Sequence, residues 1–176
     1  LTSRLDLSAV ALGLDDLAVN PVMTGLAVNL SASSLQDLAF RGELRDLLRQ
    51  NAQAARRLWL EVAEGGALKH FDAFRDLCKE LKRSGCKVGI EHFGRQFSQV
   101  GQLHDLGLDY IKVDASFVRG LDANPGNQAF LKGLCSIVHG IGIQAIAEGV
   151  VSEAEMQALA DVGFDGATGP AVKDPA

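Results

Sequence analysis

The stretch CKVGIEHFGRQFSQVGQLHDLGLDYIKVDASF, residues 86–117, decides the fold. It begins with a β-branched run at 87–90 that stops at the ionisable pair Glu91 and His92, and a glycine-centred loop with a short amphipathic segment follows. A second apolar run then ends on Asp114. The pattern predicts a strand, a helix and another strand, with ionisable groups at both strand ends. Because ligands of α/β proteins bind at the carboxyl ends of strands, the pattern indicates where a site should lie.

Length and composition limit the class of protein. The 176 residues are 47% apolar, which allows a sizeable core and suggests one domain or part of one. No apolar run approaches the roughly 20 residues of a membrane span, so we expect a soluble piece. The net charge of -5 argues against DNA or RNA as a partner, although it does not exclude a small phosphorylated ligand. The three cysteines are odd in number, widely spaced and without the spacing of a zinc site. We expect Cys78 and Cys135 to lie in the core.

Strand-like and helical segments alternate along the whole chain. Strands are predicted at 26–30, 58–62, 87–90, 110–114, 143–147 and 166–172. Helices are predicted at 5–17, 35–50, 67–84 and 98–106, after the Asn124-Pro125-Gly126 loop, and after a capping box formed by Ser152 and Glu155. Regular alternation indicates a parallel sheet with helices outside it. An open doubly wound sheet and a (β/α)8 barrel both fit this order.

The polar residues favour the barrel, because they end all six strands. An open sheet would concentrate them at one switch point, whereas a barrel gathers every strand end around one mouth. These residues are Asn29, Glu61, Glu64, Glu91, His92, Asp114, Glu148 and Thr168. A full barrel takes about 250 residues, and this chain starts with a helix that has no strand before it. We therefore expect residues 1–176 to be one partial TIM-type barrel, about strand 2 to strand 8, with the first strand missing.

Carboxylates that converge at such a mouth need neutralisation, because like charges raise each other's pKa. Hard divalent cations such as Mg²⁺ or Mn²⁺ do this with oxygen ligands, usually beside a phosphoryl substrate. Lys112 could contact a phosphate or position a water. His92 would suit zinc or iron better than magnesium, and it is also readable as a loop histidine without a function. The candidate oxygen ligands are Asn29, Glu61, Glu64, Asp114 and Glu148.

Six motifs in order resemble a known family. They are VNLS at 28–31, LEVAE at 60–64, IEHFG at 90–94, IKVDASFV at 111–118, AIAEGV at 145–150 and GFDGATGP at 163–170. The series is similar to that of EAL domains, which are TIM-barrel phosphodiesterases that hydrolyse cyclic di-GMP. Each motif alone is weak, but the resemblance covers nearly the whole chain.

The departures from the family pattern concern the metal ligands. Active members read Asp-Asp-Phe-Gly-Thr-Gly-Tyr-Ser-Ser after the central strand, and the two acidic residues hold the metals. Here these two positions are Glu91 and His92, and the family's Gln-Gly near the end is Thr168-Gly169. An imidazole in place of a carboxylate removes a negative charge and a hard oxygen, so we expect no two-metal site and no enzyme activity. Vestiges of the active site would be Lys112 and Glu148 as catalytic groups, and Asn29, Glu61 and Asp114 as metal ligands.

The resemblance implies a receptor. A pocket that has lost metal ligands but keeps its walls can bind cyclic di-GMP without destroying it, so no cofactor would be required. The expected pocket residues are Asn29, Glu61, Glu91, His92, Phe93, Gly94, Lys112, Asp114, Glu148, Gly149, Thr168, Gly169 and Pro170.

The segments EHFGRQFSQV, EGVVSEAE and GATGPAV are most similar to a degenerate EAL domain of an inner-membrane receptor. That resemblance implies a cytoplasmic domain of an inner-membrane protein, a homodimer, upstream signalling domains in the same chain and a role in biofilm or adhesion control. It also implies a periplasmic protease as an indirect partner. Two alternatives stay open. One is a residual metal-dependent phosphodiesterase that uses Lys112 and Glu148 to activate water, and the other is a dimerisation module that binds no nucleotide.

Overall fold

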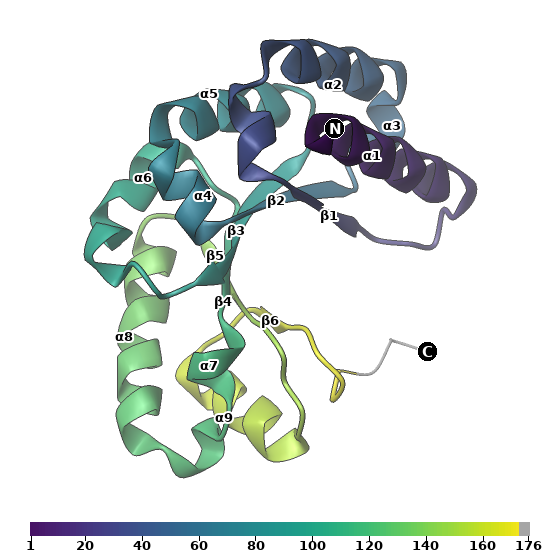
Figure 1. Ribbon diagram of the computed structural model, residues 1–176. Helices are drawn as coiled ribbons and strands as arrows, with labels where there is room; N and C mark the ends of the chain where they lie inside the picture. Colours follow the sequence, from purple (N-terminus) through teal and green to yellow (C-terminus); the bar gives the residue numbers. More distant parts are fainter. Residues whose placement is uncertain (173–176) are drawn as a thin grey trace. The chain divides into compact units, whose positions relative to one another are not determined.

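The computed structural model describes residues 1–172, apart from the side chains of Phe97 and Ser98. The chain divides into two compact units. The first unit consists of residues 1–90 and 98–108, and the second of residues 91–97 and 109 onward. Six strands form one open sheet whose order, β1-β2-β3-β4-β5-β6, follows the chain (Figure 1). The predicted α/β fold with a parallel sheet is therefore confirmed.

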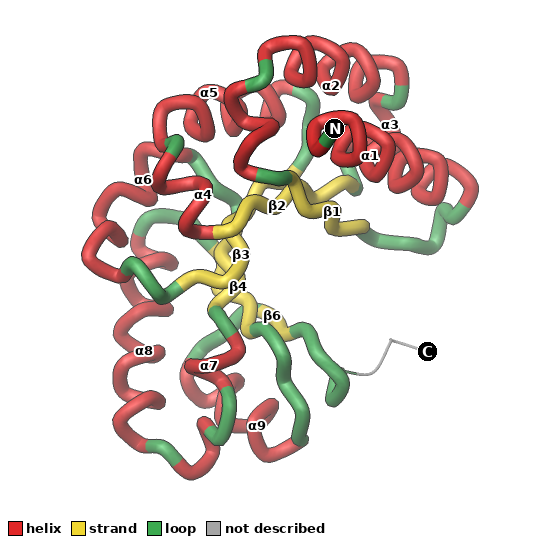
Figure 2. The backbone as a smooth tube through the Cα atoms, in the orientation of Figure 1, coloured by secondary structure: helices red, strands yellow, loops and turns green. Residues whose placement is uncertain are grey.

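Strands and helices alternate as the sequence predicts (Figure 2). The strands are β1 (Leu26–Leu30), β2 (Leu58–Ala63), β3 (Lys87–Phe93), β4 (Tyr110–Val113), β5 (Gln144–Ala147) and β6 (Gly166–Ala167). The α-helices are α1 (Thr2–Val19), α2 (Leu38–Gln50), α3 (Ala52–Ala55), α4 (Glu64–Lys69), α5 (Phe71–Arg83), α6 (Leu103–Leu106), α7 (Ala115–Val118), α8 (Pro125–Gly140) and α9 (Glu153–Val162). Three 3-10 helices are η1 (Ala32–Gln36), η2 (Phe97–Gln102) and η3 (Leu121–Ala123).

In the first unit, α1 covers β1 and packs beside α2 and α3. Val10, Leu14 and Leu17 of α1 are fully buried at helical spacing, which explains why this segment is helical and which face it packs. The buried Asp6 on the same helix accepts hydrogen bonds from the amide of Ser31 at 2.7 Å and the hydroxyl of Ser34 at 2.6 Å. These bonds fix α1 to the segment that follows β1.

In the second unit, β4, β5 and β6 are parallel, and α8 packs on β5 and α9. The start of α8 follows its sequence signals: Asn124 is the N-cap, its side-chain oxygen accepts a hydrogen bond from the amide of Asn127 at 3.0 Å, and Pro125 is the first helical residue. The Ser152 hydroxyl likewise accepts a hydrogen bond from the amide of Glu155 at the start of α9.

Three predicted elements differ in detail. The predicted helix 67–84 is two helices, α4 and α5, interrupted at His70, and α4 already starts at Glu64, directly after β2. The predicted helix 98–106 is mostly the 3-10 turn η2, with Gly101 in its middle, because glycine disfavours a regular helix. The predicted strand 166–172 pairs only over β6. Within residues 1–172, no helix is long and apolar enough to cross a membrane.

The cysteines are buried and free, as predicted for Cys78 and Cys135. Burial raises the pKa of Cys86 to about 12 and that of Cys135 to about 11. Such thiols stay protonated at neutral pH and are poor nucleophiles. The cysteines therefore act as core residues.

Candidate functional site

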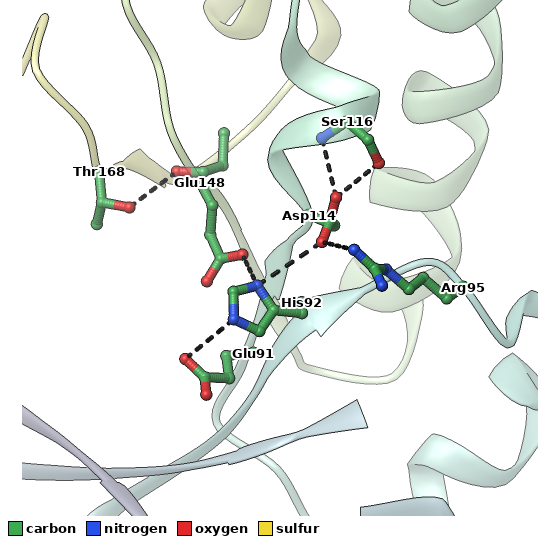
Figure 3. Close-up of polar contacts among 8 residues, drawn as sticks. Glu91, His92, Arg95, Asp114, Ser116, Glu148 and Thr168 are labelled. Carbon is green, nitrogen blue, oxygen red and sulfur yellow. Dashed lines mark hydrogen bonds and ion pairs between the residues drawn. The ribbon is translucent and has the colours of Figure 1, made fainter. Parts of the chain in front are cut away.

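Four of the predicted site residues converge in the second unit (Figure 3). Glu91 and His92 lie on β3, Asp114 follows β4, and Glu148 follows β5. The His92 imidazole lies among the three carboxylates. Its Nδ1 is 2.9 Å from Glu148 Oε2 and 3.7 Å from Asp114 Oδ2, and its Nε2 is 3.8 Å from Glu91 Oε2. Both ring nitrogens thus face carboxylates.

The backbone of His92 explains how two neighbouring residues reach one cluster. Successive side chains of a strand point to opposite faces, so Glu91 and His92 would normally diverge. His92 has φ of 54°, and it is the only residue other than glycine with a positive φ in the described part of the chain. This left-handed conformation costs about 1–2 kcal/mol for a residue with a β-carbon and breaks the alternation. Backbone strain of this kind is concentrated at functional sites.

Gly94 continues this irregular end of β3. Its φ is 127°, and a β-carbon there would lie 2.6 Å from the ring of Phe117. Only glycine fits at that distance without displacing the ring. The β3 end is therefore shaped by close packing as well as by its ionisable residues.

Glu148 is largely buried in the cluster. Its side chain is 13% exposed, and burial raises its pKa, while the nearby His92 and Lys112 partly oppose that shift. Its Oε2 is buried and, apart from the ion-pair contact with His92 Nδ1, has no hydrogen-bond partner among the described residues. The carboxylate thus keeps its acceptor capacity for a cation or a donor.

Asp114 is held as an anion. It is the N-cap of α7, and its Oδ1 accepts hydrogen bonds from the Ser116 hydroxyl at 2.6 Å and the Ser116 amide at 2.9 Å. Its pKa is lowered, chiefly by the Ser116 hydroxyl; burial opposes this, and Arg95 and His92 reinforce it. Arg95 Nη2 lies 3.4 Å from Asp114 Oδ2, and its side chain is 74% exposed. A largely exposed cation therefore borders the cluster.

The family to which the sequence is similar uses divalent metals, so the fit of a metal has to be tested on these residues. Glu91, His92 and Glu148 each offer one ligand atom, and these atoms lie within 4.8 Å of one another. The mixed nitrogen and oxygen donors suit a single borderline cation such as Zn²⁺ or Mn²⁺. They do not suit a pair of hard Mg²⁺ ions, because Mg²⁺ requires oxygen ligands and His92 supplies a nitrogen.

The first unit places the other predicted oxygen ligands on its own strand ends. Asn29 on β1 and Glu61 on β2 are register partners in the parallel pair. Asn29 is exposed, whereas Glu61 and Glu64 are only 1% and 2% exposed. Glu64 lies in the first turn of α4, where the helix dipole favours a negative charge. Asn29 is thus the accessible member of this set.

The remaining predicted pocket residues mainly shape the backbone. Phe93 is 1% exposed, and its carbonyl accepts a hydrogen bond from the Asp114 amide at 3.0 Å. Gly149 has φ of 69°, and a β-carbon there would lie 2.7 Å from that of Ala115. Gly169 is left-handed as well and lies against the backbone of Val150.

Thr168 and Pro170 are exposed. The Thr168 hydroxyl lies 3.4 Å from the carbonyl oxygen of Ala147, to which it donates a hydrogen bond, and the Thr168 amide donates to the same oxygen at 2.8 Å. Figure 3 draws the bond of this hydroxyl as a dashed line. Thr168 is therefore a polar, accessible group at the end of β6.

The sequence prediction missed Arg95 and Ser116 as members of the site. Ser116 could have been found, because an Asp two residues before a Ser at the start of a helix is a typical N-cap pattern. Arg95 stands in the loop that differs from the active family pattern. Its contact with Asp114 bridges two strand ends and could not be read from local sequence.

Comparisons with known proteins agree on one family. The family described as EAL domain matches residues 1–175. Among solved structures, the FimX EAL domain from Pseudomonas aeruginosa bound to c-di-GMP is 27% identical with a TM-score of 0.88, covering 96% of this chain and 69% of that one. A manganese and c-di-GMP complex of Klebsiella pneumoniae BlrP1 is 31% identical with a TM-score of 0.80, covering 92% of this chain and 42% of that one.

Curated relatives have similar identities and are much longer. The cyclic di-GMP phosphodiesterase PdeA of Borreliella burgdorferi is 27% identical over 139 residues, which are 79% of this chain and 21% of PdeA. The chain thus spans about a fifth of the length of such relatives. Vibrio cholerae LapD, solved as an S helix-GGDEF-EAL protein bound to c-di-GMP, is 21% identical with a TM-score of 0.83, covering 93% of this chain and 40% of that one. That likeness concerns the fold alone.

Proposed function

This chain belongs to the EAL domain family, and on that premise we propose that it is a receptor that binds cyclic di-GMP and does not hydrolyse it. Relatives with the same fold bind this dinucleotide, among them the FimX domain. The chain carries both a polar strand-end cluster and exposed cationic and hydroxyl groups beside it. These features support binding, and the composition of the cluster argues against catalysis.

The observation that carries the proposal is the position of His92. Its imidazole contacts Glu148, Asp114 and Glu91, which are the carboxylates that would otherwise surround a metal. Arg95 and Lys112 add positive charge next to Asp114 and Glu148. These side chains thus occupy the surroundings of the carboxylates, where active members hold metals. Ligand binding would then require no cofactor.

Several groups are suited to the ligand itself. The exposed Arg95 guanidinium presents the planar fork that pairs with phosphate oxygens. Lys112 is half-buried on β4 and offers a second cation for a phosphate. Thr168 is an exposed hydroxyl group at the end of β6 that can hydrogen-bond to sugar or base atoms.

The wider biological setting is proposed from the likeness to LapD. In this arrangement the chain is a cytoplasmic domain of an inner-membrane protein, forms a homodimer and passes ligand occupancy to upstream signalling domains. An indirect partner is a periplasmic protease, and the output is biofilm or adhesion control. This setting rests on the sequence resemblance of the segments EHFGRQFSQV, EGVVSEAE and GATGPAV to a degenerate EAL domain of an inner-membrane receptor.

A second candidate function is a phosphodiesterase that uses one metal ion. The observation in its favour is the Glu91, His92 and Glu148 cluster, whose ligand atoms lie close enough for one cation. Such an ion would polarise a phosphoryl oxygen or a bound water. Lys112 and Glu148, which match the catalytic groups of the family, would then orient that water.

The deciding experiment is calorimetric titration of cyclic di-GMP in EDTA and again in Mg²⁺ or Mn²⁺, followed by chromatography of the recovered nucleotide. The receptor predicts binding in both buffers and intact ligand. Linear product that appears only with metal, at roughly 1 per second or faster, establishes the enzyme instead. No heat in either buffer contradicts both candidates and favours a dimerisation module.

Paired variants test the role assigned to His92. The double change Glu91→Asp with His92→Asp restores the acidic pair of active members, and we expect Mg²⁺-dependent hydrolysis to appear. The matched control is His92→Asn, which removes the imidazole without adding a carboxylate and should stay inactive. Equal activity of both variants would show that His92 does not block catalysis.

A further inference from the structure

The first unit contains a polar pocket, away from the carboxyl ends of its strands β1 and β2. It has a volume of about 820 Å³ and lies where α2, α3 and α5 end. These three helices are labelled in Figure 1. The residues that line it are Arg45, Leu48, Arg49, Ala52, Arg56, Glu80, Lys82, Arg83, Ser84 and Gly85.

The pocket is strongly cationic although the chain as a whole carries a net charge of -5. Five of the lining residues are Arg or Lys, and Glu80 is the one acidic residue among them. The Glu80 carboxylate forms an ion pair with Arg41, in which Oε1 lies 2.5 Å from Nη2. The negative charge in the lining is thus neutralised from outside the pocket.

Three of the cations have no internal partner. Arg49 pairs with Asp46 at 3.0 Å, and Lys82 donates a hydrogen bond to the carbonyl oxygen of Gly107 at 2.9 Å. The side chains of the other three, Arg45, Arg56 and Arg83, form no ion pair or hydrogen bond with the described residues. They are exposed and available to an anion.

Helix ends explain part of this arrangement. Cations in the last turn of a helix are favoured by its dipole, which accounts for Arg49 on α2 and for Lys82 and Arg83 on α5. It does not account for Arg45, which lies more than a turn before the end of α2, or for Arg56, which follows the four-residue α3. The pocket therefore holds more positive charge than the stability of the helix ends explains.

Gly85 fixes the wall against which Arg56 lies. It ends α5 with φ of 83°, and a β-carbon there would be 3.2 Å from Arg56 Cγ. The absence of a side chain lets the Arg56 stem lie close to this turn. Arg56 and Arg83 are thereby brought to the same pocket from segments 27 residues apart.

We propose that this pocket binds a small anion with at least two phosphate groups. Its volume falls in the range of about 300–1,000 Å³ that is typical of small-molecule sites, and guanidinium groups bind phosphate oxygens in pairs. The pocket borders the segments that lead into β2 and β3, whereas Asn29 and Glu61 lie near the carboxyl ends of β1 and β2. It is therefore a separate site, and it does not depend on the function proposed above.

The test is calorimetric titration of inorganic pyrophosphate and tripolyphosphate into the full-length protein, with and without saturating cyclic di-GMP. We expect binding that cyclic di-GMP does not compete away and that weakens between about 50 mM and about 200 mM salt. Arg45→Ala and Arg56→Ala should each weaken binding by about tenfold, since one hydrogen-bonded charge pair is worth at least that factor. Arg4→Ala, an exposed arginine on α1, is the matched control and should bind normally.

Several outcomes would overturn the proposal. One is the absence of heat at about 1 mM pyrophosphate or tripolyphosphate, and another is equal binding by Arg45→Ala and wild type. A third is loss of pyrophosphate binding when cyclic di-GMP is present, because that loss would assign the anion to the strand-end site. Binding of a macromolecular polyanion such as heparin without binding of pyrophosphate would also contradict it. Arg45 is exposed, so Arg45→Ala keeps the test valid if Arg56→Ala lowers the folded yield.

Discussion

At the scale of single residues, the pKa values of two carboxylates in the cluster are shifted in opposite directions. Burial raises the pKa of Glu148, whereas the hydroxyl of Ser116 lowers that of Asp114. Both groups lie at the same nitrogen of the His92 ring, with Nδ1 2.9 Å from Glu148 and 3.7 Å from Asp114. Ionisation of Glu148 in the folded state therefore costs free energy, whereas ionisation of Asp114 does not.

Glu148→Gln should make the folded protein more stable at pH 7. The folded pKa is raised above 4.5, so the stability from this group is complete below pH 4.5 and is lost as the pH rises through the folded pKa. The neutral amide avoids that loss, and we expect a gain of up to about 1 kcal/mol in the free energy of unfolding. Urea denaturation at pH 7 and pH 4 measures it. A gain of equal size at both values contradicts the argument.

Ser116→Ala should have the reverse pH dependence. The pKa of Asp114 is lowered below 3.8, so the stability from this group is present above pH 3.8 and is lost as the pH falls through the folded pKa. Removal of the 2.6 Å bond to Oδ1 should cost about 1–2 kcal/mol at pH 7 and less at pH 3. Urea denaturation at both values checks this. Ser8→Ala, at an exposed helix position, is the control and should change little.

Four residues of the cluster, Glu91, His92, Asp114 and Glu148, were predicted from sequence, but their geometry was not. The exchange of an acidic pair for Glu91 and His92 follows from the motif alone. A strand pattern, however, places neighbouring residues such as Glu91 and His92 on opposite faces of the sheet. The left-handed φ of His92 brings both side chains into one cluster, and the two-residue alternation of apolar residues does not predict it. The conformation depends on tertiary packing, including the contact of Gly94 with Phe117.

At the scale of elements, buried acids fix helices to loops. Asp6 on α1 binds the segment after β1, and Glu155 on α9 binds two backbone amides: Gly120 at 2.9 Å and Val151 at 2.8 Å. The sequence predicts Glu155 as half of a capping box. The structure forms the Ser152 hydroxyl bond, and the Glu155 carboxylate also accepts hydrogen bonds from the amides of Gly120 and Val151. Long-range bonds of this kind, 35 residues apart for Gly120, are not visible in a local motif.

Glu155→Ala should destabilise the second unit by about 2–4 kcal/mol, because it leaves two amides without their charged acceptor. Burial raises the pKa of Glu155, but the amides of Val151 and Gly120 outweigh it and the net pKa is lowered. Its contribution is therefore present above pH 4.5 and lost at lower pH. Thermal unfolding at pH 7 and pH 4 measures it, with the exposed Gln157→Ala as control. A loss below about 0.5 kcal/mol would show that solvent replaces the carboxylate.

Element boundaries were predictable where sequence signals agreed and not where they competed. The start of α8 at Asn124-Pro125 combines helical spacing with a side-chain cap, whereas α1 has helical spacing but no side-chain cap and extends beyond the predicted 5–17 to Thr2–Val19. The 67–84 segment has continuous apolar spacing, yet the chain breaks at His70 because α4 must start directly at the end of β2. That constraint comes from the strand crossover, which no window of local sequence contains.

At the scale of the whole molecule, positive and negative charges are distributed unevenly along the chain. The pocket formed by α2, α3 and α5 gathers cations, although the overall charge is negative. In the strand-end cluster, His92 and Arg95 lie next to acids. Both arrangements leave some cationic groups exposed to ligands. A phosphorylated ligand should therefore stabilise the folded chain without help from metal.

Saturation with cyclic di-GMP should raise the melting temperature equally in EDTA and in Mg²⁺. Free ligand at about 100 times its Kd contributes about 2.7 kcal/mol, and for a domain of this size about 2–4 °C of melting temperature corresponds to each kcal/mol. We therefore expect a rise of about 5–10 °C in both buffers, measured by scanning calorimetry. The linear dinucleotide is the control for product binding and should give a smaller shift. A rise that requires Mg²⁺ would mean that the carboxylates around His92 do hold a metal, because only then would chelation remove the binding site.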